Sequence, residues 1–301
     1  MRLWMMLDYR RMRFLAYSSF SLCLIFGVLR TRAVPSCPIT MNSNAFDDQY
    51  EGCELEMENA IRSHLLKQEK NFDPEFALAW DLALEAWMES KKYFQEEIEI
   101  PASLQDEHVV ALIIYSNDTV YSDFNEAVRN YDRENFHYHS LHFFMTQALK
   151  QLRLDCPVPV YRGVGGVRLL PEDIGGKIRF GQFTSSSRNR TVAENFGMRT
   201  FFNISTCFGA DIHNFSPFPG EEEVLIPIDE VFEVTGFTRD GGESRFVLKT
   251  TESRCHYYNC DFLRKDGKSR RCVFSRGTKD LLSSAAIALL FSVLIFTITD
   301  S

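Results

Sequence analysis

The chain has 301 residues, of which 45% are hydrophobic and 25% are charged, and its formal net charge is −8. This balance is typical of a folded globular protein. Residues 1–33 hold six Arg and one Asp, a charge of +5, so the rest of the chain carries −13. This acidic character argues against a nucleic-acid partner bound through its phosphates.

Residues 1–33 have the pattern of a secretory signal peptide. A basic start precedes the apolar run "LAYSSFSLCLIFGVL", and Thr31-Arg32-Ala33 offers a loose cleavage site before Val34. The mature protein is therefore expected to begin near Val34, with a short segment over 34–44 leading into the folded part.

The other end of the chain, residues 281–301, is an apolar tail that follows a polar stalk over 266–280. The tail has roughly the length of a GPI-attachment signal, and it ends in Asp300-Ser301 without the basic flank typical of a spanning helix. We expect a lipid-anchored protein on the outer face of the plasma membrane, with Ser275 and Ser283 as candidate attachment residues. A secreted form and a single spanning helix remain alternatives.

Cysteines and sequons agree with an extracellular location. Of eight cysteines, Cys23 lies in the signal peptide, and the odd remainder of seven leaves one unpaired or paired outside the chain. Four N-x-S/T sequons are candidates for glycosylation: Asn117, Asn189, Asn203 and Asn214.

The first half of the folded part has helical periodicity. Met57, Ile61 and Leu65 share one helix face, and Asp73-Pro74 opens a helix whose core positions are predicted to be Phe76, Trp80 and Leu84. A further helix is predicted from apolar residues between Leu141 and Leu152 at helical spacing. We interpret these as core stripes and not as sites.

From Pro157 onward the pattern changes to short β-rich runs, with one helical insert at "RTVAENFG". The runs are "PVPVYRGV", "GKIRFGQFTSSS", "RTFFNISTC", "EEEVLIPI", "EVFEVTGF" and "SRFVLKTTE". Helices followed by strands predict an α+β fold, and the lack of repeats or linkers predicts one domain over residues 45–265.

Polar residues interrupt three of these strands. Alternation puts Arg162 on the face of Val158 and Val160, where an apolar residue is expected. "FTSSS" ends in hydroxyls, and period two puts Glu221 and Glu223 on one strand face. Each feature alone fits a structural salt bridge, a turn cap or a solvated strand edge.

Together, "VYRGV", "GQFTSSS" and "FPGEEEVLIP" occur in the order and spacing of the arginine, serine and glutamate triad of mono-ADP-ribosyltransferases. The chain most resembles the vertebrate arginine-specific ecto-ADP-ribosyltransferases, which are typically GPI-anchored or secreted. The resemblance extends over most of the mature chain and includes "VVALIIYSND", "FNEAVRNY", "YHSLHFFMTQAL", "ENFG" and "HYYNC". It implies a helical part followed by a β-rich NAD-binding core.

The resemblance also implies roles for individual residues. Glu223 is expected to be the catalytic glutamate, Arg162 an NAD anchor, Ser185 the serine that orients Glu223, and Glu221 the determinant of arginine as acceptor. Phe218 is expected in the loop that presents the target residue. Further positions near NAD are Tyr115, Gly163, Gln182 and, more weakly, Ser216.

These roles agree with the chemistry. Cleavage of the nicotinamide–ribose bond develops positive charge on the ribose, which a carboxylate stabilises. Nicotinamide leaves readily, so neither a metal nor a histidine is needed, and NAD is the only co-substrate implied. The forked guanidinium of Arg162 suits a pyrophosphate or ribose oxygen. Expected partners are arginine-bearing extracellular or membrane proteins.

The family analogy further implies the disulfides Cys53–Cys260 and Cys156–Cys207, and leaves Cys37, Cys255 and Cys272 unassigned. The sequon at Asn214 would place a glycan in the target-presenting loop, and we expect that site to be unoccupied.

Other features of the sequence bear on alternative functions. The histidines of "HYHSLH", His137, His139 and His142, lack neighbouring ligands at metal spacing and are expected to be surface or core residues. A glycosidase is disfavoured, because an i, i+2 carboxylate pair on one strand cannot straddle a sugar bond. An NAD glycohydrolase and a catalytically inactive surface-binding protein remain alternatives.

Overall fold

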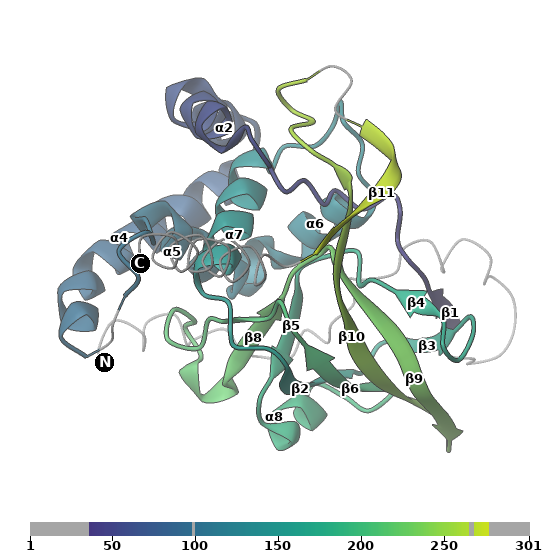
Figure 1. The fold of residues 1–301 in the computed structure, drawn as a ribbon. Helices are drawn as coiled ribbons and strands as arrows, with labels where there is room; N and C mark the ends of the chain where they lie inside the picture. Colours follow the sequence, from purple (N-terminus) through teal and green to yellow (C-terminus); the bar gives the residue numbers. More distant parts are fainter. Residues whose placement is uncertain (1–35, 98–99, 265–267, 277–301) are drawn as a thin grey trace, which may run out of the picture.

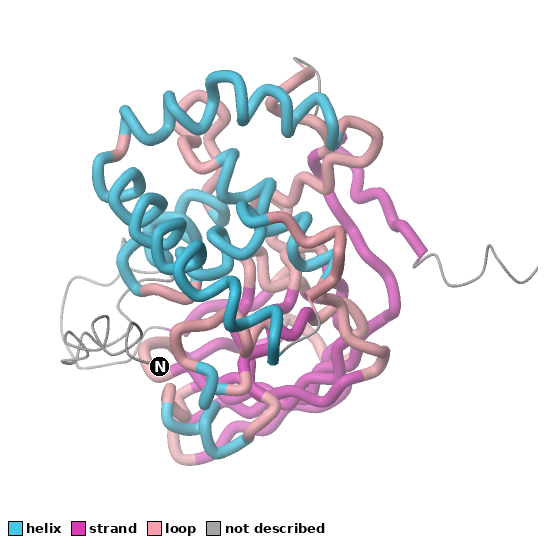
Figure 2. The backbone as a smooth tube through the Cα atoms, turned by 90° about the vertical axis from the view of Figure 1, so that its left-hand side faces the viewer, coloured by secondary structure: helices cyan, strands magenta, loops and turns pink. Residues whose placement is uncertain are grey.

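The computed structural model describes residues 36–97, 100–264 and 268–276. The helices gather on one side of the molecule and the strands on the other, with α8 as the helix among the strands (Figures 1 and 2). The helical part comprises α2 (Glu54–Ala60), a π-helical turn η3 (Ile61–Leu65), α3 (Leu66–Phe72), α4 (Pro74–Glu97), α5 (Asp106–Tyr115), α6 (Asp118–Arg129) and α7 (His139–Gln151). The predicted α+β class is confirmed.

The strands form one large mixed sheet and one small pair. In the large sheet the order is β4 (Lys177–Ile178), β9 (Glu230–Asp240), β10 (Glu243–Tyr258), β6 (Thr200–Thr206), β2 (Val158–Val164), β5 (Thr184–Ser187), β8 (Glu223–Ile226) and β7 (Ala210–Asp211). β11 (Lys268–Arg276) pairs with β10, and β1 (Ser36–Ile39) pairs in parallel with β3 (Arg168–Pro171). In the large sheet β6 and β10 are parallel, and the other pairs are antiparallel.

One predicted strand needs correction, and one segment outside the predicted strands forms a further strand. The run "GKIRFGQFTSSS" is two separate strands, because Gly181, with φ of +71°, interrupts it, and β4 and β5 lie at distant positions of the sheet. Part of the predicted stalk is the strand β11, whose backbone pairs with β10 from Ser253 to Tyr258. The candidate attachment residue Ser275 lies in this strand, opposite Arg254.

The long helix α4 corrects one predicted core position. Phe76 and Trp80 are buried as expected, but Leu84 is 37% exposed, and the stripe continues through Ala83 and Trp87. The reason is the helical period of 3.6, which turns a strict four-residue spacing away from the core by the second step, at Leu84.

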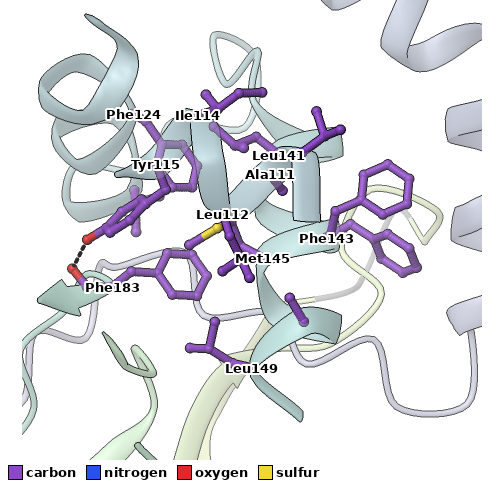
Figure 3. Close-up of a cluster of buried hydrophobic side chains, with 14 of the residues drawn as sticks. Ala111, Leu112, Ile114, Tyr115, Phe124, Leu141, Phe143, Met145, Leu149 and Phe183 are labelled. Carbon is purple, nitrogen blue, oxygen red and sulfur yellow. Dashed lines mark hydrogen bonds between the residues drawn. The ribbon is translucent and has the colours of Figure 1, made fainter. Parts of the chain in front are cut away.

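The apolar side chains form two clusters. One fills the space between the helices and one face of the sheet, and it includes α5 from Val109 onward, the apolar residues of α7 and Phe183 (Figure 3). The other lies between the large sheet and the β1–β3 pair. In the first cluster the Tyr115 hydroxyl donates to the Phe183 carbonyl at 2.7 Å, which ties the end of α5 to the chain just before β5 (Figure 3).

The disulfides join segments far apart in the sequence. Cys53 pairs with Cys260 and Cys156 with Cys207, as the family analogy implies, and Cys255 pairs with Cys272. None of the cysteines in the described ranges is free. The Cys156–Cys207 bond joins the segment before β2 to the end of β6, next to the strand that carries Arg162.

The predicted signal peptide, the apolar tail and Ser283 lie outside the described residues. Within the described ranges, none of the helices combines the length and the apolar character needed to span a membrane.

Candidate active site

Arg162 and Ser185 lie on neighbouring strands. β2 and β5 are antiparallel partners, with Tyr161 opposite Ser187. The half-buried Arg162 guanidinium donates from Nη1 to the Ser185 carbonyl oxygen at 2.6 Å. One fork of the guanidinium is therefore fixed by the sheet.

Glu223 is the first residue of β8 and faces the same side of the sheet as Ser185 and Ser187. Ser187 lies opposite Glu223 and Ser185 opposite Leu225, so Ser185 is the diagonal neighbour of Glu223. The Ser185 side chain forms a hydrogen bond with Glu223. Ser116, at the end of α5, donates from Oγ to Glu223 Oε2 at a longer 3.4 Å.

The environment of Glu223 changes its acidity. The side chain is 6% exposed. Burial, more than any other cause, raises the pKa of Glu223 to about 7; the neighbouring Glu221 raises it too, whereas the hydroxyls of Ser185 and Ser116 and the charge of Arg162 lower it. The carboxylate thus exchanges its proton near neutral pH.

Glu221 does not lie on the strand face where the sequence pattern places it. It ends the 3₁₀ turn η4 (Pro219–Glu221), and Glu222 adopts a left-handed conformation with φ of 48°. The alternation of side chains between the two sheet faces therefore begins only at Glu223, where β8 begins. The turn is held by the Ser187 hydroxyl, which donates to the Glu221 carbonyl at 2.7 Å, and by Asn189 Nδ2, which donates to Glu222 Oε1 at 3.1 Å. Glu221 nevertheless lies close enough to raise the pKa of Glu223.

Glycines allow α8 (Arg190–Asn195) to approach β2 beside Arg162. A Cβ on Gly163 would lie 2.1 Å from the Ala193 carbonyl oxygen and 2.4 Å from that of Gly197. A Cβ on Gly197, whose φ is +119°, would lie 2.4 Å from Gly165 Cα. The glycines of "YRGVGG" and "ENFG" therefore serve one close backbone contact. Gly163 is predicted to lie near NAD, and here its visible role is steric.

Two other predicted NAD positions have buried side chains. Tyr115 is 1% exposed and bonded to Phe183, so its ring belongs to the core. Gln182 is 6% exposed, and its Oε1 accepts a hydrogen bond from Arg129 Nη1. Their contact with NAD stays a prediction.

The loop before η4 carries the remaining predicted residues. The Ser216 hydroxyl accepts a hydrogen bond from the Phe218 backbone N–H at 3.2 Å, and Ser216 is buried, whereas Phe218 is half-buried. Ser216 thus shapes the loop that positions Phe218. Asn214 is half-buried just before it.

The sequence reasoning missed Ser116 and Arg129. Ser116 directly follows Tyr115 in "IIYSND", and a hydroxyl one residue past a helix is ordinarily interpreted as a cap, so nothing local marked it. Arg129 lies near Arg162: burial first, and the charge of Arg162 among smaller causes, lowers the pKa of Arg129. An arginine in the last turn of the amphipathic helix α6 was the available signal.

Two histidines of the run, His139 and His142, are part of the core, whereas His137 is half-buried against the ring of Phe72. His142 is fully buried, its Nδ1 shares a hydrogen bond with the Tyr50 hydroxyl at 2.7 Å, and its Nε2 lies 2.9 Å from the Phe46 carbonyl. Across the described ranges, no three or more His, Cys, Asp or Glu side chains are grouped so as to hold a metal ion.

A buried carboxylate oriented by serine hydroxyls, next to a guanidinium and placed on a helix-covered mixed sheet, is the arrangement of a mono-ADP-ribosyltransferase. Such a site stabilises a developing positive charge and binds an anionic substrate. A model of the NAD:arginine ADP-ribosyltransferase family matches residues 39–256. The chain belongs to this family.

Two relatives match most of this chain and most of their own length. The Mus musculus protein named Ecto-ADP-ribosyltransferase 5 is 40% identical over 285 residues, covering 89% of this chain and 90% of the mouse protein. The Oryctolagus cuniculus GPI-linked NAD(P)(+)--arginine ADP-ribosyltransferase 1 is 38% identical over 275 residues, 84% of each protein.

Solved structures give the same fold. The crystal structure of the eukaryotic mono-ADP-ribosyltransferase ART2.2 is 35% identical, has a TM-score of 0.65, and is matched over 74% of this chain and 98% of its own length. A mutant of ART2.2 in complex with NAD matches with a TM-score of 0.64 at 34% identity.

Proposed function

We propose that this chain transfers ADP-ribose from NAD to arginine side chains of extracellular or membrane proteins and releases nicotinamide. The observation that carries the proposal is the Glu223 carboxyl, buried at the start of β8, hydrogen-bonded by Ser185 and Ser116 and adjacent to Arg162. Family membership and the ART2.2 complex with NAD support NAD as the co-substrate.

Glu223 is the catalytic carboxylate in this proposal. When the bond between nicotinamide and ribose breaks, positive charge develops on the ribose, and a carboxylate held in a low-dielectric site stabilises that charge strongly. Ser185 and Ser116 fix the carboxylate rotamer, so no reorganisation is needed during the reaction. Since only the ionised form stabilises a cation, the site works best above the pKa of Glu223.

Arg162 binds the anionic part of NAD. Its Nη1 is used by the Ser185 carbonyl, which orients the guanidinium and leaves other donors for a phosphate or ribose oxygen. Arg129 brings a second guanidinium near the first. Two cations near one another fit the two negative charges of a pyrophosphate.

Glu221 receives the acceptor arginine. Its place at the end of η4 puts a carboxylate beside Glu223 but outside the strand, at the edge where the loop of Phe218 meets solvent. A carboxylate pairs with an incoming guanidinium and helps to remove its proton, which is otherwise held too tightly for nucleophilic attack.

The cell-surface location is supported by the ends of the chain and by the relatives. Some relatives are named ecto-enzymes, and others are named GPI-linked. A signal peptide over 1–33 and an attachment signal over 281–301 would place this chain at the same surface, with residues 45–265 as the enzymatic domain.

The test incubates the purified protein with NAD labelled in the adenylate and with agmatine or polyarginine, beside a Glu223→Gln variant. The proposal predicts label on the acceptor with wild type and none with the variant. Nicotinamide release without label transfer would show an NAD glycohydrolase instead. No consumption of NAD by folded wild type would leave an inactive surface-binding protein.

A further inference from the structure

A polar cavity lies away from the candidate active site. It has a volume of about 230 Å³ and opens between the C-terminal end of α7, the loops after β6 and β8, and the middle of β10. None of the predicted catalytic or NAD-binding residues lines it. β8 connects the two places, since Glu223 begins this strand and Pro227, just past its end, lines the cavity.

Three cationic side chains line this cavity: Lys150, Arg153 and Arg254. Only Arg254 has a carboxylate partner, with Nη2 at 2.8 Å from Asp229 Oδ1. Within the described ranges no carboxylate lies at ion-pair distance from Lys150 or Arg153, which donate hydrogen bonds to the carbonyls of Gln49 and Cys207, respectively. Three cations and one paired carboxylate leave two positive charges without a close counter-ion.

The remaining acidic neighbours compensate this charge only in part. Glu230 acts on Arg153, but burial raises the pKa of Glu230 to about 7, and its oxygens already accept hydrogen bonds from Thr206 and the Cys207 N–H. The negative charges of Glu54 and Glu51 act to raise the pKa of Lys150, but both carboxylates lie beyond ion-pair distance from it. Burial first, and Arg254 next, lower the pKa of both Lys150 and Arg153.

Two polar atoms at the cavity have no hydrogen-bond partner among the described residues. They are Nε of Arg254 and Oγ1 of Thr146, a side chain that is only 4% exposed. Buried polar groups are nearly always hydrogen-bonded, so a missing acceptor is indicated. An oxyanion accepts from a guanidinium and from a hydroxyl at once.

Gln49 also lines the cavity, and its Oε1 accepts a hydrogen bond from Arg254 Nη2 at 2.6 Å. The remaining lining is apolar and the space is small. Leu149, Phe183 and Phe208 contribute apolar surface, and Arg153 lies over the Phe208 ring at 4.2 Å from its centroid. Pockets for drug-sized ligands measure roughly 300–1,000 Å³, so this one suits a compact molecule.

We propose that this cavity binds a small organic phosphate monoester, with its dianionic head among Lys150, Arg153 and Arg254 and its apolar body against Phe183 and Leu149. A phosphate dianion matches the two uncompensated charges, and its oxygens match the forked guanidinium donors. The site is distinct from the NAD-binding site.

Titration calorimetry on the purified protein tests this proposal with phenyl phosphate as the probe. Two partial probes accompany it: inorganic phosphate, which lacks the aromatic ring, and benzyl alcohol, which lacks the phosphate. The variants are Lys150→Gln and Arg153→Gln, with Lys67→Gln on the exposed side of α3 as the matched charge control. Melting temperatures confirm that each variant is folded. Arg254 is left intact because its ion pair with Asp229 is buried.

Phenyl phosphate is expected to bind wild type and Lys67→Gln equally, and more tightly than either partial probe. Each cavity variant is expected to weaken binding roughly tenfold or more, because each loses one charge-assisted hydrogen bond. Binding must persist in an Arg162→Gln variant. No binding, equal loss in the Lys67 control, inorganic phosphate binding as tightly as phenyl phosphate, or loss in Arg162→Gln would each overturn the proposal.

Discussion

At the residue scale, the pKa of Glu223 links the structure to a measurable rate. Burial is the largest cause of a pKa of about 7, and Glu221 adds to it. Residue types alone predicted a carboxylate at position 223. Its pKa also depends on burial and on the hydroxyls of Ser185 and Ser116, and Ser116 lies just past α5, more than 100 residues earlier in the chain. Such long-range contacts are not readable from strand alternation.

The pH dependence of NAD cleavage follows from this pKa. Because only ionised Glu223 stabilises the cationic ribose, kcat/KM for NAD should fall about tenfold per pH unit below 7 and reach a plateau above 8. In a Glu221→Gln variant, removal of the neighbouring negative charge should move the midpoint to lower pH. A steady-state profile of nicotinamide release from pH 5 to 9 measures both, and an unchanged rate across that range would contradict the assignment.

Gly163 offers a second test at this scale. In Gly163→Ala the added methyl group meets the backbone oxygens of Ala193 in α8 and of Gly197 just past it, which cannot rotate away, so α8 must shift from β2 and from Arg162. We expect a loss of about 1–3 kcal/mol in the free energy of unfolding and a rise in KM for NAD.

Gly220→Ala is the matched stability control, since a Cβ at Gly220 has nothing within 4 Å. Denaturant unfolding measures the free energy of unfolding of both variants. Equal stabilities would show that the contact between α8 and β2 is loose.

At the element scale, the order of helices and strands was predictable and the ends of elements were less so. Long periodic segments such as α4 and α7 follow from apolar spacing, and the strand runs from Pro157 onward follow from β-branched residues between turn residues. The small strands β1, β3 and β7 were missed because segments of two to four residues carry too little pattern.

The turn before β8 shows why local pattern fails at the site. Alternation extended two residues too far, because the left-handed Glu222 breaks the strand. Asn189 holds the Glu222 side chain and Ser187 holds the Glu221 carbonyl, both from other parts of the chain. The arginine, serine and glutamate still meet, because sheet register brings β2, β5 and β8 together. The order of neighbouring strands in the sheet was not predictable from their order in the chain.

The same turn allows a prediction about glycosylation. Asn189 uses Nδ2, the atom that would carry a glycan, to hold Glu222, and its Oδ1 accepts from the Thr191 N–H. Asn203 is instead exposed on the outer face of β6. Glycopeptide mass spectrometry of the protein from mammalian cells should therefore find Asn203 occupied and Asn189 largely unoccupied. Full occupancy of Asn189 would contradict its role in holding the turn.

At the scale of the whole molecule, buried carboxyls make stability depend on pH. Burial is the first cause that raises the pKa of Asp47 to about 6 and of Glu69, Glu223 and Glu230 to about 7. Their unfolded values lie near 4, so between these values the native state binds more protons than the unfolded state. Stability from these groups therefore increases as the pH falls from 8 toward 5.

Buried histidines act in the opposite direction. Burial lowers the pKa of His108 to about 4 and of His139 and His142 to about 3, so the unfolded state binds more protons below its value near 6.5. The free energy of unfolding should rise from pH 8 to 6.5 and then change more slowly. Urea unfolding at pH 8, 6.5 and 5 checks this, and a steady decrease from pH 8 to 6.5 would contradict it.

The central claim is that Glu223 serves the cleavage of NAD and Glu221 serves the transfer to arginine. The most direct measurement follows nicotinamide release and ADP-ribosyl-agmatine formation together, in wild type, Glu223→Gln and Glu221→Gln. The account predicts that Glu223→Gln loses both products, whereas Glu221→Gln retains nicotinamide release and loses transfer. Equal loss of both activities in the two variants would contradict this division between the carboxylates.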